Sequence, residues 1–379
     1  MDNSKKYLLL ASDERSYLDL FNISKELNRQ NKPFCFLYSL TQERSFQINS
    51  FSLKNNYSNE KYFIKELNIA LPFDPDVVIM SNENWDPEKS LIGLFKKLGK
   101  YVACVETSSY LSLGLSSKLE IFSRKSYPTN CADVFFDHSE WSKKNKEICG
   151  WYKHKSVVTG NPKYDDINSK PNKTSKKIII LGLKEPNHRK YLMSNIDTVI
   201  NKFPDHEILY KPHPVEHLDF PKDFDSDYLK TFNLKLIKSQ SSLMDHIYDC
   251  ELVVSMLQSI LYYALALNKK VILIDNPNIK NISIDGFTEE MTEERFSFWQ
   301  GILNIKNFKH FQEMIGFDCV CEMNQRNNEL RENFISNCLT LKNLNKSYNN
   351  KNLLHYFNYK QKNKASQTII NFIENEFKK

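Results

Sequence analysis

Short apolar runs alternate with longer segments of helical spacing through the first part of the chain. Tyr7–Ala11 is a continuous apolar run, and Ser16–Gln30 then has apolar residues at helical spacing, namely Leu18, Phe21, Ile23 and Leu27. The same alternation continues with strand-like runs at 32–38, 77–80, 101–105, 134–136 and 157–159, and a helical segment at 88–98. Strands that alternate with helices predict a parallel sheet covered on both faces.

A polar segment rich in Lys, Asn and Ser at 168–177 interrupts this rhythm, which makes it the best linker in the chain. The alternation then restarts, with strand-like runs at 178–181, 207–210, 234–237, 252–254 and 271–275, and helical segments at 189–202, 242–248 and 260–267. We therefore predict an α/β protein with two Rossmann-like, doubly wound domains facing an interdomain cleft. Such sheets bind ligands at the carboxyl ends of their strands.

The last part of the chain has a different character. Past about Ile305 the pattern is helical and polar, and residues 341–363 are rich in Asn and Lys. Ala365–Phe377 has near-helical apolar spacing and predicts an amphipathic helix that packs back on the first domain, with a membrane-surface role as the alternative. The predicted parts are an N-terminal acceptor domain (1–167), the linker (168–177), a C-terminal nucleotide-donor domain (178–345) and a C-terminal loop and helix (346–379).

Composition narrows the class of protein. The chain has 379 residues, of which 41% are hydrophobic and 26% charged, so it can bury two cores. Its net charge of +6 fits anionic substrates or an anionic membrane surface and falls short of a nucleic-acid-binding signature. None of its eight cysteines forms a Cys-x-x-Cys pair, and no run reaches the roughly 20 apolar residues of a membrane span. We expect a cytoplasmic protein with reduced thiols, with peripheral contact at the inner membrane left open.

The clearest chemical signal is the segment Tyr210-Lys-Pro-His-Pro-Val-Glu216, which follows a strand-like run. Pro212 and Pro214 fix their own φ angles and restrict the residues before them, so His213 is held on a stiff loop. A positioned histidine can donate a proton or hydrogen bond to a departing phosphate. Lys211 could add positive charge there or face solvent; Glu216 could meet the donor ribose or cap a following helix.

A second signal is a strand-to-helix turn that carries Ser255 and Ser259. A helix start with unpaired N–H groups and nearby hydroxyls can bind an anion, although a serine can equally be an ordinary helix cap. Gly182 follows another predicted strand and would let the backbone approach a ligand. The nucleotide-phosphate residues predicted for this domain are Lys211, Pro214, Ser255, Ser259, Gly182 and Glu216, around His213.

These motifs resemble those of a known group. Gly160-Asn-Pro-Lys-Tyr-Asp165 after a strand, Lys-Pro-His-Pro, and the Ser-x-x-x-Ser helix start are similar to bacterial surface-carbohydrate transferases of the GT-B fold. The group includes capsule-type Kdo transferases, bacterial sialyl- and polysialyltransferases and, more distantly, CDP-glycerol glycerophosphotransferases. The resemblance covers roughly residues 130–280. It implies that His213-Pro214 and the serines contact the nucleotide phosphate, although Ser255 and Ser259 depart from the adjacent Ser-Ser of many members.

The resemblance also implies a carboxylate of the first domain as general base. Glu106 directly follows the run 101–105, and a carboxylate at the carboxyl end of a parallel strand faces the ligand side of the sheet. It loosely resembles the acidic motif of polysialyltransferases. Asp137, at the next strand end, and Glu83 are the second and third choices, and a helix-capping role is the alternative for Glu106.

Other polar clusters carry less weight. Asp223-Phe-Asp225 has Asp-x-Asp spacing in a polar loop without further ligands, and the histidines form no zinc pattern, so we expect no metal and no cofactor. His188 and Arg189 follow Gly182 and could meet a phosphate, but we expect them to face solvent.

The sequence therefore predicts an inverting, metal-independent GT-B glycosyltransferase. Glu106 would be its base and His213 its leaving-group catalyst. The donor would be cytidine-linked, most readily CMP-Kdo or a CMP-sialic-type acid, and the acceptor a bacterial surface glycan or glycolipid of capsule or lipopolysaccharide. The alternatives are a CDP-glycerol or UDP/GDP-sugar transferase of the same fold, a non-catalytic capsule-assembly subunit, and a sugar-nucleotide epimerase.

Overall fold

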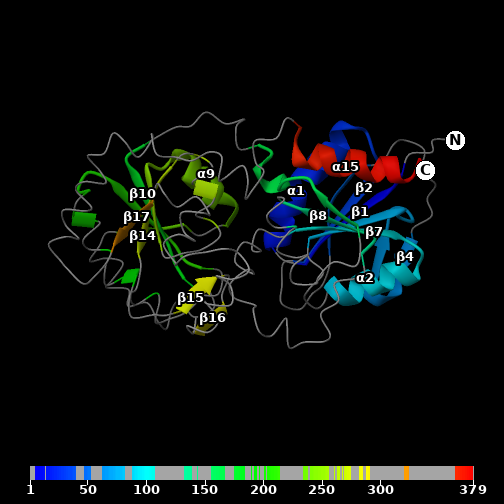
Figure 1. The fold of residues 1–379 in the computed structure, drawn as a ribbon, viewed down its shortest axis with the longest axis horizontal. Helices are drawn as coiled ribbons and strands as arrows, with labels where there is room; N and C mark the ends of the chain where they lie inside the picture. Colours follow the sequence, from blue (N-terminus) through cyan, green and yellow to red (C-terminus); the bar gives the residue numbers. More distant parts are fainter. Residues whose placement is uncertain are drawn as a thin grey trace. The chain divides into compact units, whose positions relative to one another are not determined.

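The chain forms two compact units (Figure 1). Unit 1 comprises Met1–Leu111, Ser117–Asp166 and Leu353–Lys379, and unit 2 comprises Ser112–Ser116 and Ile167–Asn352. The computed structural model describes residues 5–12, 14–39, 47–52, 62–81, 88–106, 132–138, 143, 155–166, 175–183, 189, 192–193, 196, 200–201, 203–213, 234–237, 240–255, 260, 263–264, 267, 269–274, 281–284, 287–290, 320–323 and 363–378.

Unit 1 is built on a sheet whose strand order, within the described residues, is β3-β2-β1-β6-β7-β8-β9. Its strands are β1 (Tyr7–Ala11), β2 (Phe34–Tyr38), β3 (Gln47–Ser52), β6 (Val77–Met80), β7 (Tyr101–Val105), β8 (Val134–Asp137) and β9 (Lys155–Val158). All neighbours pair in parallel except β2 and β3, which are antiparallel. The edge strand β3 and the hairpin of β4 (Tyr62–Ile64) and β5 (Ile69–Leu71), joined through the short helix η1 (Lys65–Leu67), were not predicted.

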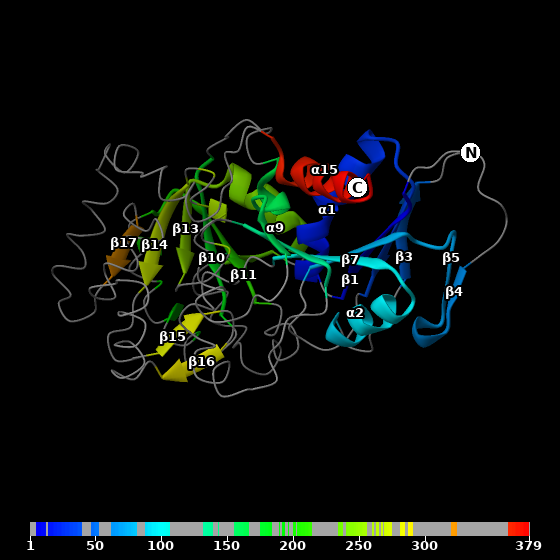
Figure 2. The same ribbon diagram turned by 45° about the vertical axis from the view of Figure 1, so that its right-hand side comes forward.

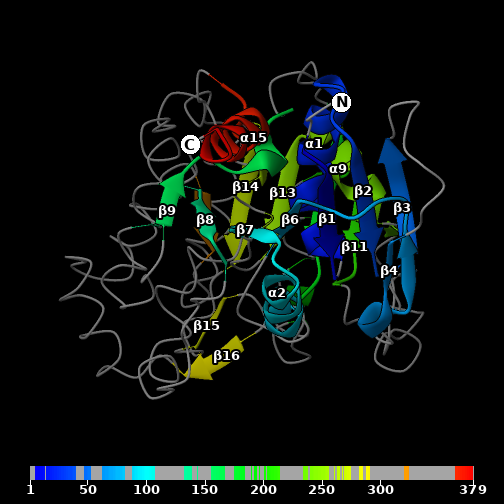
Figure 3. The same cartoon turned by 90° about the vertical axis from the view of Figure 1, so that its right-hand side faces the viewer.

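Both faces of this sheet are covered, as Figures 2 and 3 show. Successive strand residues point to opposite faces, so Tyr7 and Leu9 join one cluster while Leu8 and Leu10 join another. The helices α1 (Glu14–Arg29) and α15 (Ala365–Glu376) contribute to the first cluster, and α2 (Glu88–Lys97) to the second. The continuous apolar runs of the central strands therefore reflect burial on both sides.

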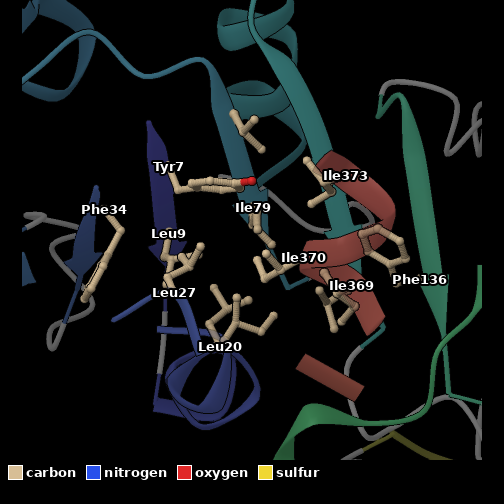
Figure 4. Packing of buried hydrophobic residues seen from close by; sticks show 14 of the residues in the cluster. Tyr7, Leu9, Leu20, Leu27, Phe34, Ile79, Phe136, Ile369, Ile370 and Ile373 are labelled. Atoms are coloured by element: carbon tan, nitrogen blue, oxygen red, sulfur yellow. The ribbon is translucent and has the colours of Figure 1, made fainter. Parts of the chain in front are cut away.

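The C-terminal helix α15 is part of the core of unit 1 (Figure 4). Ile369, Ile370 and Ile373 are fully buried against β1, α1 and Phe136 of β8. Polar contacts fix its end: the Tyr7 hydroxyl donates to Glu374, which also pairs with Lys32 at 2.7 Å. The apolar face of this amphipathic helix therefore packs against a sheet whose first strand lies more than 300 residues earlier in the chain.

Unit 2 contains a second parallel sheet, ordered β12-β11-β10-β13-β14-β17 among the described residues. Its strands are β10 (Lys177–Leu181), β11 (Glu207–Lys211), β12 (Lys235–Leu236), β13 (Leu252–Ser255), β14 (Lys270–Ile274) and β17 (Val320–Met323). A separate hairpin joins β15 (Asn281–Ile284) to β16 (Phe287–Glu290). The purely helical interpretation past Ile305 is wrong at β17, which adds a parallel edge strand beside β14.

One face of this second sheet packs against residues of the predicted helix 189–202. Leu192, Met193 and Ile196 form a buried cluster with Ile178, Ile180, Tyr210 and Val254 of the strands. The described residues of that segment are helical, and α9 (Gln240–Asp249) lies where residues 242–248 predict a helix. The prediction of two α/β units, each built on a largely parallel sheet, is therefore confirmed.

Candidate functional site

Three strands of unit 2 end side by side at the carboxyl edge of its sheet. Lys211 pairs with Leu181, and Val254 pairs with Ile180, which places Ser255 on the other side of Leu181. The backbone N–H of Gly182 donates to Lys211 O at 2.8 Å, so the ends of β10 and β11 remain bonded one residue beyond the paired strands. The structure thus brings together Gly182, Lys211 and Ser255, which the sequence predicts as phosphate ligands.

Lys211 is buried, with 4% of its surface exposed. Its ammonium donates to the carbonyl oxygen of Pro212 at 3.2 Å. The alternative of a solvent-facing lysine is therefore wrong. A lysine held at this position places positive charge at the carboxyl edge of the sheet, the edge at which doubly wound sheets bind ligands.

Ser255 is completely buried, and its hydroxyl donates to the carbonyl oxygen of Leu181 at 2.9 Å. This bond uses the single proton of the hydroxyl and ties the end of β13 to the end of β10. A phosphate contact by Ser255 requires this bond to be exchanged, and it stays a prediction. Pro214, Glu216 and Ser259 lie outside the described residues.

His213 stands two residues beyond β11 and is half-buried, while Pro212 before it is buried. The backbone on either side of Lys211 is anchored: Ile237 N–H donates to Tyr210 O at 2.9 Å, and Gly182 N–H to Lys211 O. The strand end therefore has a fixed position from which the Pro212–His213 segment starts. The assignment of His213 to the leaving group stays a prediction.

The carboxyl edge of the sheet in unit 1 carries polar residues as well. Ser81 follows β6, Glu106 follows β7, His138 follows β8 and Thr159 follows β9, and all four are buried. Because parallel strands end at one edge, these residues stand in a row along the carboxyl edge of the sheet, where α/β sheets of this kind bind ligands. Glu83, the third choice for the base, lies outside the described residues.

Glu106 is the first-choice base, and only 1% of it is exposed. Its Oε2 accepts a hydrogen bond of 2.8 Å from the backbone N–H of His138. Its own N–H donates to Phe136 O at 2.9 Å, and its carbonyl oxygen lies 2.6 Å from His138 Nε2. The carboxylate is therefore held between two strand ends.

Asp137, the second choice, is part of β8 and is fully buried. Its carboxylate accepts a hydrogen bond from the Ser156 hydroxyl of β9, and its carbonyl accepts from Thr159 N–H at 2.9 Å. These contacts brace β8 against β9. The choice of Glu106 over Asp137 as the base stays a prediction.

The Gly160–Asp165 motif lies just past β9, at the same edge. Gly160 has a φ of +83°, which favours glycine, and Asn161 Oδ1 accepts from Lys163 N–H at 2.9 Å to start the short helix η2 (Pro162–Tyr164). Burial raises the pKa of the Tyr164 hydroxyl, and the Asp19 carboxylate adds to that shift. Asp165 binds the start of α15, so the motif joins the sheet to the C-terminal helix.

The sequence reasoning missed two residues of these edges. His138 is not among the residues singled out from the sequence, although its ring contacts Glu106. Arg189 was expected to face solvent, but it is 4% exposed and Nη1 donates to Leu183 O at 3.4 Å, near the end of β10. Only the adjacency of strand ends, which no local pattern encodes, could have singled them out. In the described part of the chain, no group of three or more His, Cys, Asp or Glu residues could hold a metal ion.

No protein-family model matches the chain, and no curated protein matches it in sequence. Solved structures do resemble it. The UDP-GlcNAc 2-epimerase of Methanocaldococcus jannaschii, in complex with UDP-GlcNAc and UDP, shares 14% identity over 97% of this chain and 99% of its own, with a TM-score of 0.53. The Neisseria meningitidis UDP-GlcNAc 2-epimerase bound to UDP-GlcNAc shares 14% identity over 98% of this chain and 100% of its own, with a TM-score of 0.57.

The wall teichoic acid polymerase TagF is similar over 98% of this chain and 89% of its own, at 12% identity and a TM-score of 0.63. Likeness at this level of identity shows the fold. The chain is an α/β protein of the GT-B type with two Rossmann-like domains, as the sequence predicts. None of the helices described combines the length and the apolar character needed to cross a bilayer.

Proposed function

We propose that the protein is a glycosyltransferase that moves a sugar from a nucleotide-activated donor to a hydroxyl group of a glycan or glycolipid acceptor. The observation that carries this proposal is the buried Lys211 at the carboxyl edge of the second sheet, beside Gly182 and Ser255. Doubly wound sheets bind ligands at this edge, and a buried ammonium favours an anion there. The GT-B fold supports it, because solved proteins of similar fold carry UDP or UDP-GlcNAc.

In this proposal the second unit holds the donor phosphate. Lys211 supplies positive charge, the glycine at 182 lets backbone approach a phosphate oxygen, and His213 donates a hydrogen bond or proton to the departing phosphate. Stabilising charge that develops on a leaving group is worth several orders of magnitude in rate when the donors are preorganised. Ser259, Pro214 and Glu216 complete the predicted phosphate-binding set.

The first unit activates the acceptor. Glu106 takes the proton from the acceptor hydroxyl, the oxygen attacks the anomeric carbon, and the bond from that carbon to the phosphate oxygen breaks. The electron pair of this bond leaves with the nucleotide, and the configuration at the anomeric carbon inverts. A positioned carboxylate base of this kind contributes about 10²- to 10⁴-fold in rate.

The donor is the finer part of the proposal. Resemblance of the motifs favours a cytidine-linked donor, CMP-Kdo or a CMP-sialic-type acid, and CDP-glycerol is related chemistry. The solved epimerase structures of similar fold instead hold UDP-GlcNAc, in one case together with UDP. A binding experiment therefore has to compare CMP, CDP, UDP and GDP side by side.

Thermal unfolding with each nucleotide tests the donor site, because a ligand that binds only the folded state raises the melting temperature. We expect one nucleotide class to stabilise the wild type and His213→Ala to weaken that binding about tenfold or more. The matched control is His246→Ala on the last turn of α9, which precedes the amino end of β13 and leaves the carboxyl edge intact. Stabilisation by none of the four nucleotides would contradict the proposal.

Product analysis separates transfer from the second candidate function, epimerisation. That candidate is favoured by the nearly complete coverage of two UDP-GlcNAc 2-epimerase structures. A transferase releases nucleotide and consumes the acceptor, whereas an epimerase converts the sugar nucleotide into an isomer without any acceptor. Nucleotide binding with neither product would identify a non-catalytic subunit.

A further inference from the structure

Glu106 and His138 form a buried pair across the ends of β7 and β8. The two residues are 1% and 5% exposed. His138 contacts Glu106 in two ways: its backbone N–H donates to Oε2 at 2.8 Å, and its ring Nε2 lies 2.6 Å from the Glu106 carbonyl oxygen. The second ring nitrogen, Nδ1, lies 3.8 Å from Oε2.

These contacts determine which nitrogen of the His138 ring carries a proton. A backbone carbonyl can only accept a hydrogen bond, so Nε2 must carry the proton at this contact. While Nε2–H donates to the carbonyl of Glu106, the other ring nitrogen, Nδ1, lies 3.8 Å from Oε2 of the same residue. The imidazole therefore spans both the backbone and the side chain of Glu106.

The contact between His138 and Glu106 lies at the point where the chain leaves β7. Glu106 is the first residue after β7: its backbone N–H donates to Phe136 O of β8 at 2.9 Å, and its carbonyl oxygen contacts the ring of His138. The ring of His138 supplies a hydrogen bond to that carbonyl from the neighbouring strand end. A side chain on rigid elements with supporting hydrogen bonds holds its reactive group in one geometry.

We propose that His138 is the positioning residue for Glu106. Its ring fixes the chain just past β7 and thereby holds the carboxylate where it takes the proton of the acceptor hydroxyl. The inference rests on the proposed transferase function, in which Glu106 is the base. His138 itself does not touch the acceptor; it acts through Glu106.

Two substitutions at one position separate the ring contact from the backbone contact, which any residue at 138 retains. His138→Gln carries an amide N–H that can reach the Glu106 carbonyl in place of Nε2, and His138→Ala carries none. Ser156→Ala is the matched control: it removes the hydroxyl that braces Asp137 on the same edge and leaves Glu106 untouched. Glu106→Gln sets the scale for complete loss of the base.

We expect His138→Ala to lower kcat about 100-fold, as displacement of a catalytic group by about 1 Å does, with the donor KM unchanged. His138→Gln should recover most of that loss, and Ser156→Ala should retain wild-type kcat. A His138→Ala enzyme as active as the Ser156→Ala enzyme overturns the inference, and so does a His138→Gln enzyme no better than His138→Ala.

Two further measurements keep the test decisive. If the wild type transfers no sugar from any donor, the proposed function fails, and a crystal structure of His138→Ala then shows whether the carboxylate of Glu106 moves. An unmoved carboxylate contradicts positioning. If His138→Ala does not fold, ¹⁵N spectra of the wild-type histidines decide, because an Nε2 without a proton contradicts the ring contact.

Discussion

The carboxylate of Asp165 binds the first backbone N–H of a helix two hundred residues later in the chain: Oδ1 accepts from Ala365 at 2.7 Å. Its other oxygen accepts from Ser366 N–H at 2.9 Å. The first N–H groups of a helix have no partner within the helix, so Asp165 satisfies two of them and places negative charge at the positive end of α15.

We predict that Asp165→Ala lowers the free energy of unfolding by about 2 kcal/mol, because it removes two hydrogen bonds to a charged acceptor at a helix start. The unfolding free energy of Asp165→Asn should lie between those of the wild type and Asp165→Ala, since the amide oxygen of Asn can still accept one of the two hydrogen bonds. The matched control is Asp166→Ala, whose ion pairs with Lys25 and Lys364 involve half-exposed lysines and should contribute less than about 1 kcal/mol. Equal losses for Asp165→Ala and Asp166→Ala in denaturant unfolding would refute this.

The apolar face of α15 should matter as much as its start. Ile370→Ala removes a fully buried side chain from the core of unit 1 and should lower the unfolding free energy by about 3 kcal/mol. Asn371→Ala, at the exposed neighbouring position, should change it by less than about 0.5 kcal/mol. Thermal unfolding of both variants measures the difference; similar midpoints would mean that α15 is not held by its core face.

Ser255→Ala tests the bond between the ends of β13 and β10. The substitution leaves the buried carbonyl of Leu181 without its donor and should lower the unfolding free energy by about 1–3 kcal/mol. Ser81 offers the contrast: its buried hydroxyl has no hydrogen-bond partner within the described residues, so Ser81→Ala should be neutral or slightly stabilising. A stable Ser255→Ala protein that loses only nucleotide affinity would instead show that the hydroxyl serves the ligand.

The dependence of stability on pH should involve Glu251 of unit 2. Burial favours a higher pKa for this carboxyl, but hydrogen bonds with Lys270 and His206 outweigh it, and its pKa lies below the ordinary 4.5. A carboxyl whose folded pKa is lowered contributes stability above its unfolded pKa and loses it as the pH falls through the folded value. The contribution of Glu251 is therefore full above pH 4.5 and disappears below it.

Glu251→Gln should accordingly destabilise the protein by about 1 kcal/mol at neutral pH, and its difference from the wild type should shrink as the pH falls below that value. Glu207→Gln is the control, since the Lys235 that Glu207 binds is well exposed and the pair should be worth less. Unfolding curves over a pH series check this. A difference that grows on acidification would show that the sign is wrong.

Much of the fold could be predicted from the chain. The buried central strands β1, β6, β7, β10, β11 and β13 appear as continuous apolar runs because both of their faces are covered. Of the edge strands, β9 and β12 were predicted, but β3, a mixed polar segment, and β17, a short run in a polar region, were not. Edge strands pack on fewer neighbours, so their sequences are less constrained.

For the candidate site, the positions of the residues along the strands could be predicted from the sequence. Residues that directly follow a strand, such as Glu106, Lys211 and Ser255, could be placed at a carboxyl edge from the α/β rhythm alone. Their surroundings could not: the burial of Lys211 and Arg189 depends on residues packed over the strand ends. Their roles in catalysis and phosphate binding stay predictions.

By itself, the sequence determined the central strands, the helices between them and the polar residues that follow those strands, because apolar periodicity and chain order are local properties. Only the tertiary structure decided that the ring of His138 holds the carbonyl of Glu106, that the Ser255 hydroxyl is bonded to Leu181, and that α15 completes the core of unit 1. Each of these joins residues far apart in the chain. Such pairs depend on which strands lie next to each other, and strand order is set by packing of the whole sheet.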